Sequence, residues 1–308
     1  MHVYIGVLSC LVCICVAHPH NHTWDHYDQG KTWLTKFEKF CAGKKQSPIN
    51  IKNPQCDKAL NDSITFINYD NAGPTKFPFE NNGHWLIVRA ASTTAKINLG
   101  GPITYRFHQL HFHWGKDDTR GSEHQLDGEV FPAAMHLYHI NEKYTSFHDA
   151  QDKKDGFAML SFFVKIGDKN PAFDFLNFTT HSKLIDPETK VNITQFALNK
   201  LLPKNLTVIY RYEGSITNPT CDESILWTIF DQPVYISKSQ LAELRRLKDR
   251  NNKTLVDNYR AVQDLNGRKI TYWSEAKCGS RDSAATALGA SIFSALFSLL
   301  LFTFINAC

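Results

Sequence analysis

Short runs of β-prone residues recur along the middle of the chain, and this recurrence constrains the fold more than any other feature. Branched and aromatic residues fill each run, and turn residues such as Asn82-Gly83 and Gly100-Gly101 separate the runs. The runs span residues 63–69, 84–90, 95–99, 103–114, 134–141, 157–166, 206–214 and 225–230. One helix is predicted at 237–248, because a serine begins this segment and basic residues end it. We therefore expect a mainly β (α+β) domain with a few short helices.

Length and charge limit the possible functions. No internal repeat or long linker interrupts residues 20–278, so we expect one domain there, with a large core drawn from a chain that is 43% hydrophobic. The 34 basic and 30 acidic residues are spread along the chain. Because no basic block stands out, the sequence gives no support to nucleic-acid binding.

The amino-terminal segment indicates export. Residues 3–16 form an apolar run interrupted only by small residues, and it ends at Cys15-Val16-Ala17, which suits a signal-peptidase site. We predict a signal peptide at 1–17. The start of the segment carries no Lys or Arg, so a short buried segment is the alternative.

The carboxyl-terminal residues 284–308 carry no charge and are long enough to cross a bilayer. Small residues, among them Cys278, Gly279 and Ser280, precede this tail. Small residues, a short polar spacer and a terminal apolar tail are the signal for a glycolipid (GPI) anchor. We predict that residues 279–308 are this signal and are removed, with attachment within 274–283. The mature chain would then lie on the extracellular face of the plasma membrane; a retained membrane helix is the alternative.

Cysteines and glycosylation sequons agree with export. Between the two ends lie four cysteines, which permit three pairings that spacing alone cannot separate: Cys41, Cys56, Cys221 and Cys278. Asn-x-Ser/Thr sequons are candidate glycosylation sites in a secreted protein. They occur at Asn21, Asn61, Asn177, Asn192, Asn205 and Asn252.

The segment QLHFHWG at 109–115 places two histidines on alternate residues. Side chains alternate along a strand, so Gln109, His111 and His113 share one face. Two such histidines alone favour an ordinary surface or hydrogen-bonded pair. A third, His136, lies in the run 134–141. Three neutral imidazoles leave one tetrahedral position open for water, which is the arrangement of a catalytic zinc site.

Several longer motifs in the sequence are specific enough to indicate a protein family. They are QSPINI at 46–51, NNGH at 81–84, QLHFHWG at 109–115, GSEHQLDGE at 121–129, MHLYH at 135–139, GSITNPTCDE at 214–223 and NYR at 258–260. From about residue 24 to 277 the chain resembles the alpha-class carbonic anhydrases, in particular their GPI-anchored extracellular branch. The resemblance implies a monomer built around a large twisted, mostly antiparallel sheet, with zinc at the bottom of a conical cleft.

The resemblance also implies site roles. The zinc ligands fall on His111, His113 and His136, and a zinc-bound hydroxide would attack carbon dioxide to give bicarbonate and a proton. Glu123 and Thr217 match the pair that orients the hydroxide, because the threonine donates its proton to the carboxylate. His84 matches the histidine that carries the proton to solvent. The apolar wall for the substrate falls on Tyr138, Met159, Ile216 and Trp227.

Partners of the zinc ligands differ from the family pattern at one position. Gln109 matches the partner of His111, and the backbone carbonyl of Asn258 matches that of His113. The family usually has a glutamate two residues before the third ligand, where this chain has Ala134. We therefore predict faster zinc loss than in relatives that keep the glutamate.

The anchored branch of the family also has a disulfide, which falls on Cys41 and Cys221; Cys56 and Cys278 remain and are hypothesised to pair. Two functional hypotheses follow from the resemblance. The first is a cell-surface zinc lyase that interconverts carbon dioxide and bicarbonate, with esterase activity at most a side reaction. The alternative is a slow or inactive surface binding module on the same fold. The intact ligands and orienting pair argue against the alternative, whereas Ala134 and the bulky Tyr138 and Met159 leave room for it.

Overall fold

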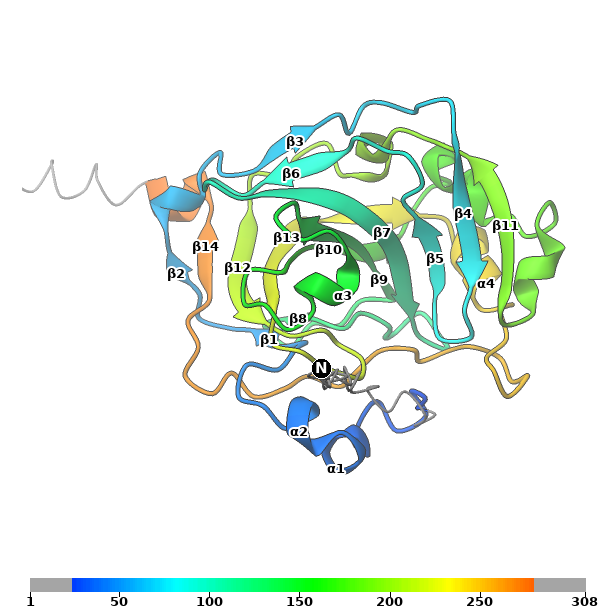
Figure 1. The fold of residues 1–308 in the computed structure, drawn as a ribbon, viewed down its shortest axis with the longest axis horizontal. Coiled ribbons are helices and arrows are strands. Elements are labelled where there is room, and N and C mark those ends of the chain that lie inside the picture. The colour runs from blue at the N-terminus through cyan, green and yellow to red at the C-terminus, as the bar shows by residue number, and fades with distance from the viewer. Residues whose placement is uncertain (1–23, 280–308) are drawn as a thin grey trace, which may run out of the picture.

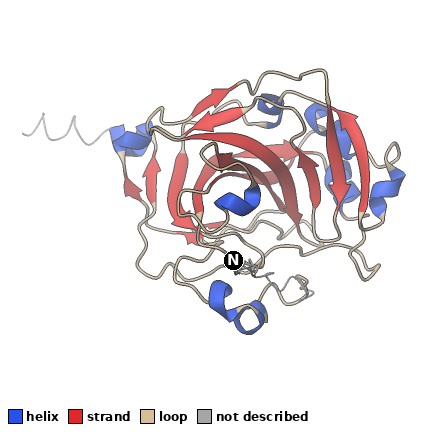
Figure 2. Ribbon diagram, in the orientation of Figure 1, coloured by secondary structure: helices blue, strands red, loops and turns tan. Residues whose placement is uncertain are grey.

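The computed structural model describes residues 24–279, which form one large curved sheet with short helices around it; in Figures 1 and 2 most helices lie towards the edges of the view, and α3 (Phe147–Ala150) lies near its centre. The helices are α1 (Trp33–Lys36), α2 (Glu38–Cys41), α3 (Phe147–Ala150) and α4 (Lys238–Leu244), with 3-10 turns η1 (Lys58–Leu60), η2 (Pro171–Leu176), η3 (Ser182–Ile185) and η4 (Leu198–Leu201) and a π turn η5 (Glu275–Gly279). The strands are β1 (Asn50–Ile51), β2 (Gln55–Cys56), β3 (Thr65–Ile67), β4 (Lys76–Asn81), β5 (Leu86–Arg89), β6 (Lys96–Asn98), β7 (Thr104–Trp114), β8 (Gln125–Leu126), β9 (Ala133–Asn141), β10 (Phe157–Ile166), β11 (Thr189–Thr194), β12 (Ile209–Gly214), β13 (Ile225–Ile236) and β14 (Thr271–Trp273).

The main sheet has twelve strands in the order β11-β4-β5-β7-β9-β10-β13-β12-β14-β2, with the β3–β6 pair joined to it at β7. Within it, only the β10–β13 and β14–β2 pairs are parallel. A separate two-stranded sheet joins β1 to β8. The predicted mainly β domain with a mostly antiparallel sheet is therefore confirmed. In Figure 1 the long strands β7, β9 and β10 curve through the centre of the molecule.

The central strands are buried on both faces. Alternate residues of β9 and β10, such as Leu137 and Leu160, join the larger apolar cluster on one face. Tyr138 and Met159 join a second cluster on the opposite face. A strand buried on both sides is normally apolar throughout. Polar side chains of β9 and β10 on the face of the second cluster are therefore unexpected, and they suggest a chemical role.

The helix predicted at 237–248 begins as expected but ends earlier. Ser237 Oγ accepts a hydrogen bond from Gln240 N, and Gln240 Oε1 accepts one from Ser237 N, which makes a capping box. The helix ends at Leu244, so the prediction that its last turn is basic is wrong. Arg245 follows the helix and donates to Asp118 at 2.7 Å, so its charge serves a tertiary contact with the loop after β7.

Some predictions fall outside the described part of the chain. The signal peptide at 1–17, the sequon at Asn21 and residues 280–308 of the anchor signal are among these, and they stay predictions. Within residues 24–279, no helix has the length and apolar character needed to span a bilayer.

Two disulfides close long loops. Cys41 at the end of α2 is bonded to Cys221, with an S–S distance of 2.03 Å and a sequence separation of 180. This is the pairing that the family resemblance implied. Cys56 in β2 is bonded to Cys278 in η5, across a separation of 222, so the hypothesised second pairing is also present. Disulfides of this kind form and persist in oxidising compartments, which indicates an extracellular protein.

The first disulfide predicts a measurable stability difference. Replacing Cys41 and Cys221 with serine should lower the free energy of unfolding by about 3–5 kcal/mol, because the unfolded chain regains the freedom of a long closed loop. Urea unfolding measures this. Serine at both Cys56 and Cys278 is the matched control. This variant should lose a similar free energy of unfolding, but only the variant that lacks the Cys41–Cys221 bond should show faster amide exchange around Thr217. Equal exchange in both variants would contradict a bracing role for the first disulfide.

Candidate metal centre

Strand register brings three histidines together. His111 on β7 lies directly opposite His136 on β9, and His113 follows two residues later on the same face. The ring centroids of these residues are 4.8–5.3 Å apart. One potential ligand atom from each lies within 4.8 Å of the others. This cluster fits a metal ion held by three imidazoles with a further position left open.

Burial keeps these imidazoles neutral. His113 and His136 have no exposed surface, and His111 is 7% exposed. Burial lowers the pKa of His113 to about 4, although the nearby Asn258 carbonyl opposes the shift. Burial, and after it repulsion from His113, holds the pKa values of His111 and His136 well below the usual range. The neutral ring is the form that binds zinc, so the donor set fits this ion.

A carboxylate faces the same point. Glu123 Oε2 lies 3.4 Å from His113 Nε2 and 3.8 Å from His136 Nδ1. Its other oxygen accepts a hydrogen bond from the backbone N–H of Arg260 at 3.1 Å, and the Thr217 side chain is near enough to favour the ionised carboxylate and lower its pKa. Burial raises the pKa of Glu123 to about 8, against the opposing effects of Arg260 and Thr217. A divalent cation among the histidines would favour the ionised form and lower this pKa again.

The outer nitrogens of His111 and His113 have different surroundings. His113 Nδ1 lies 2.8 Å from the Asn258 carbonyl, and Trp114 N donates to Asn258 Oδ1, which fixes that residue. Gln109 does not meet His111 in this way. Its Oε1 accepts from Arg89 at 2.9 Å, and His111 Nδ1 has no hydrogen-bond partner among the described residues. The geometry therefore matches the predicted Asn258 contact and does not contain the predicted Gln109 contact.

Among residues 24–279, no side chain forms a hydrogen bond with His136 from behind the metal centre. Ala134 lies two residues before it on the same face of β9, where its methyl group offers no acceptor. His136 Nδ1 faces Glu123, so Nε2 is the atom that points away from the metal centre. Nε2 is buried without a hydrogen-bond partner among the described residues.

A cleft of about 350 Å³ opens beside His111. Of the four residues predicted to form the substrate wall, Tyr138 and Ile216 line it. Met159 and Trp227 are not among its lining residues; they lie in the buried apolar cluster behind it. Most of the remaining lining is polar, including Asn82, Arg89, His108, Gln109, Gln151, Asn218 and Thr220.

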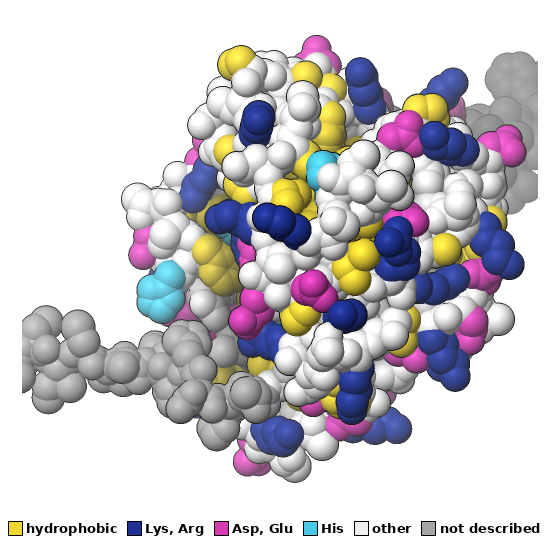
Figure 3. Space-filling model, turned by 90° about the vertical axis from the view of Figure 1, so that its right-hand side faces the viewer, with side chains coloured by type: hydrophobic (Ala, Val, Ile, Leu, Met, Phe, Trp, Pro, Cys, Tyr) yellow, Lys and Arg dark blue, Asp and Glu magenta, His cyan; other side chains and the backbone are white. Residues whose placement is uncertain are grey.

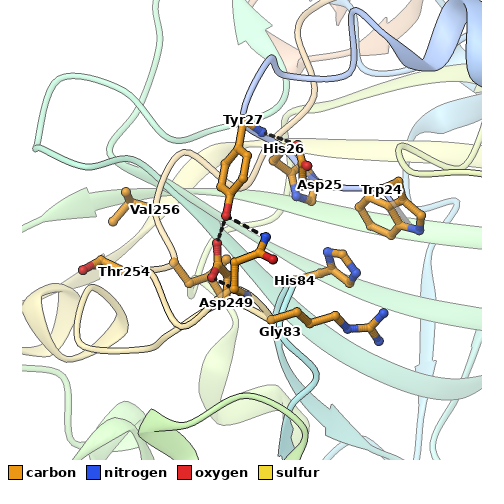
Figure 4. Close-up of a pocket in the computed structure, with 12 residues that line it drawn as sticks. Trp24, Asp25, His26, Tyr27, Gly83, His84, Asp249, Thr254 and Val256 are labelled. Atoms are coloured by element: carbon orange, nitrogen blue, oxygen red, sulfur yellow. Dashed lines mark hydrogen bonds between the residues drawn. The ribbon is translucent and has the colours of Figure 1, made fainter. Parts of the chain in front are cut away.

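His84 lies in a separate pocket under the amino-terminal segment. Its ring stacks on Trp24, with centroids 3.8 Å apart and planes 9° apart, and the two rings lie side by side in Figure 4. The residue is 6% exposed. Burial, and after it the positive charge of Arg250, lowers the pKa of His84 to about 4.

Sequence reasoning missed His26. It is 6% exposed, its ring centroid lies 6.2 Å from that of His84, and its Nε2 has no partner among the described residues. Tyr27 is 55% exposed, and its hydroxyl bonds with Asp249 and Asn251 (Figure 4). One feature of the sequence could have pointed to His26: the segment Trp24–Tyr27 has one residue more than is usual in the family. With this extra residue, the histidine lies inside and the tyrosine faces outward.

Trp85 is a second residue that the sequence did not single out. Its ring centroid lies 5.6 Å from that of His84 and 5.9 Å from that of His111. It also lines the cleft. The indole therefore stands between the metal centre and the residue predicted to carry the proton.

Comparison with known proteins gives a consistent result. A sequence model of the family described as eukaryotic-type carbonic anhydrase matches residues 28–274. The chain is 35% identical to putative carbonic anhydrase 5 of Caenorhabditis elegans, over 87% of this chain and 89% of the relative. It is 36% identical to carbonic anhydrase 15 of Mus musculus, over 80% and 81%. It is 35% identical to carbonic anhydrase 6 of Homo sapiens, over 75% and 76%.

Proposed function

Because this chain belongs to the eukaryotic-type carbonic anhydrase family, we propose that it hydrates carbon dioxide reversibly at the outer cell surface and that His84 carries the released proton. Family membership makes the chain a zinc-dependent lyase, a carbonate dehydratase. The cell-surface location and the role of His84 are the finer parts of the proposal.

One observation carries the catalytic part: three neutral, buried imidazoles and the carboxylate of Glu123 face one point. When bound there, zinc supplies a Lewis acid that makes a water molecule acidic enough to lose its proton near neutral pH. The chain supplies orientation. In this role the Thr217 hydroxyl, whose side chain acts on the Glu123 carboxylate, would donate to it, which leaves the hydroxyl oxygen to accept a hydrogen bond from the attacking oxygen. The apolar side chains of Tyr138 and Ile216 offer carbon dioxide a surface in the adjoining cleft.

Stopped-flow measurement of carbon dioxide hydration tests this proposal. Turnover of the purified protein should disappear on zinc removal and return on zinc restoration. Negligible turnover with zinc bound would favour the second candidate, a surface recognition module. The replacement of the usual glutamate by Ala134 and the large Tyr138 side chain in the cleft are the observations that keep this candidate in view.

The role of His84 requires a change of position. A proton carrier works best when its pKa lies near the working pH, whereas burial beneath Trp24 lowers the pKa of His84 to about 4. At pH 7 the stacked ring is therefore neutral and holds a proton poorly. We expect the ring to accept a proton after it has moved away from Trp24 into solvent, where its pKa returns towards 6.5.

Two variants test this role. Replacing His84 with alanine should lower kcat at least about 10-fold in weak buffer and leave kcat/KM nearly unchanged, because proton release follows the chemical step. Added imidazole buffer should restore kcat. Replacing Trp24 with alanine should raise the pKa of His84 towards 6.5, since the ring gains solvent and the buried neutral form loses its advantage. NMR titration measures this pKa, and equal kcat values for wild type and the His84 variant would rule out the role.

Several features support an extracellular location. Both disulfides require an oxidising compartment, and the sequon asparagines among the described residues are all exposed: Asn61, Asn177, Asn192, Asn205 and Asn252. Basic and acidic side chains are interspersed over the face in Figure 3, so that face presents no purely basic patch. Release from intact cells by a phosphatidylinositol-specific phospholipase should occur if a glycolipid anchors the chain. Resistance to the phospholipase, with release by detergent alone, would favour a retained membrane helix.

A further inference from the structure

Three buried polar atoms without partners among the described residues belong to the third metal-centre histidine and to two residues near it. They are His136 Nε2, His124 Nδ1 and Ser161 Oγ, and none has a hydrogen-bond partner among the described residues. His136 and Ser161 are directly opposite each other across the β9–β10 pair, so their side chains share a face. The rings of His124 and His136 have centroids 6.2 Å apart.

These atoms lie in otherwise apolar surroundings. The second apolar cluster contains Met159 and Phe163, the residues on either side of Ser161 on that face of β10. Trp227 packs its ring 4.6 Å from that of His124 and 5.1 Å from that of His136. Buried polar atoms in such surroundings are normally hydrogen-bonded, so each of these atoms requires a partner.

Ala134 stands at the position from which the family's usual partner of His136 would come. It precedes His136 by two residues on the same face, and its side chain is a single methyl group. A glutamate at this position would accept from His136 Nε2, as the family resemblance implies. Alanine leaves His136 Nε2 without that acceptor, and the nearby His124 Nδ1 and Ser161 Oγ also lack partners among the described residues.

The hydrogen-bonding chemistry fits water. His136 turns Nδ1 towards the metal centre, so in the neutral ring the proton lies on Nε2, which must donate. His124 Nε2 is paired with the Tyr212 hydroxyl at 2.7 Å, so its Nδ1 is either donor or acceptor according to the tautomer. The Ser161 hydroxyl can play either part. Water can accept from His136 and adapt to both remaining partners, and two to four polar partners are what a buried water requires.

We propose that one buried water molecule, held by His136 Nε2, His124 Nδ1 and Ser161 Oγ beside Ala134, replaces the missing carboxylate and orients the third zinc ligand. Ser161 and His124 are then positioning residues that act on zinc through His136. This deepens the proposed function, because it concerns the zinc ligand of the same centre.

Zinc release into excess chelator measures this role without any assay of turnover. Ser161→Ala should speed release about 10-fold, within the range usual for loss of an outer partner of a ligand. Ala134→Glu should slow release, since the carboxylate then accepts from His136 directly. In the Ala134→Glu background, Ser161→Ala should change the release rate less than twofold, because the water is no longer needed.

A matched control separates this effect from general loosening of the fold. Ser63→Ala removes another buried serine hydroxyl, outside strands β9 and β10, and should leave the release rate unchanged. The proposal is overturned if Ser161→Ala leaves release unchanged, or if it speeds release by the same factor in both backgrounds.

A high-resolution crystal structure is the direct test. A solvent peak within hydrogen-bonding distance of all three atoms supports the proposal, and density that shows no water there refutes it. Both readouts are separate from carbon dioxide hydration. The water can therefore be refuted in an active enzyme, and an inactive protein can still contain it.

Discussion

Substitution of His113 by alanine should reduce carbon dioxide hydration to the background rate of the buffer and remove bound zinc. Only two of the three imidazoles would remain as ligands. Because His113 is fully buried, water from bulk solvent would not readily take the place of its ring. Without the Lewis acid, water near neutral pH stays protonated and is a poor nucleophile. Metal analysis and stopped-flow kinetics on the same preparation measure both losses.

His108 provides the matched control for this prediction. It lies on the same strand β7 and lines the cleft, but it is not part of the three-histidine cluster. His108→Ala should therefore keep one zinc per chain and most of the activity. A His113 variant that still binds stoichiometric zinc and turns over would show that the metal centre has been placed wrongly.

Thr217→Ala should lower kcat/KM by about 10²-fold while zinc stays bound. The methyl side chain can neither donate to Glu123 nor accept from the attacking oxygen, so the reacting atoms lose their alignment. Thr217→Ser keeps the hydroxyl and should recover most of the activity.

Glu123→Gln gives a second route to the same loss. The amide nitrogen is a donor, so it competes with the Thr217 hydroxyl for the hydrogen bond that sets the orientation. Because the two residues act as one unit, the double variant should be hardly slower than either single variant. Fully additive losses in a double-mutant cycle would mean that Thr217 and Glu123 act independently.

Much of the fold could be predicted from the sequence because apolar and β-branched residues mark the central strands. The run at 157–166 coincides with β10, and those at 103–114 and 134–141 differ from β7 and β9 by one residue at one end. Strands β4 and β11 were missed, as were the very short strands β1, β2, β8 and β14. β4 contains Pro78, and β11 alternates polar and apolar residues at an edge of the sheet, so neither resembles a strand buried on both faces.

The metal centre could be predicted because alternation along a strand places His111 and His113 on one face. The contacts around it could not, because they depend on tertiary packing. Gln109 reaches Arg89 on a neighbouring strand instead of the ligand that it was predicted to meet. The burial of His26 likewise depends on how the amino-terminal segment lies over residues far along the chain.

The bond between Cys56 and Cys278 also has a mechanical meaning. Cys278 lies at the end of the described chain, and Cys56 lies in the edge strand β2, which pairs in parallel with β14 (Figure 1). Without this bond, tension applied to the chain after residue 279 would peel β14 from the sheet one hydrogen bond at a time. With it, the disulfide passes part of the load directly into β2, so β14 and the stretch of chain between the two cysteines, which holds the whole catalytic cleft, no longer bear it alone.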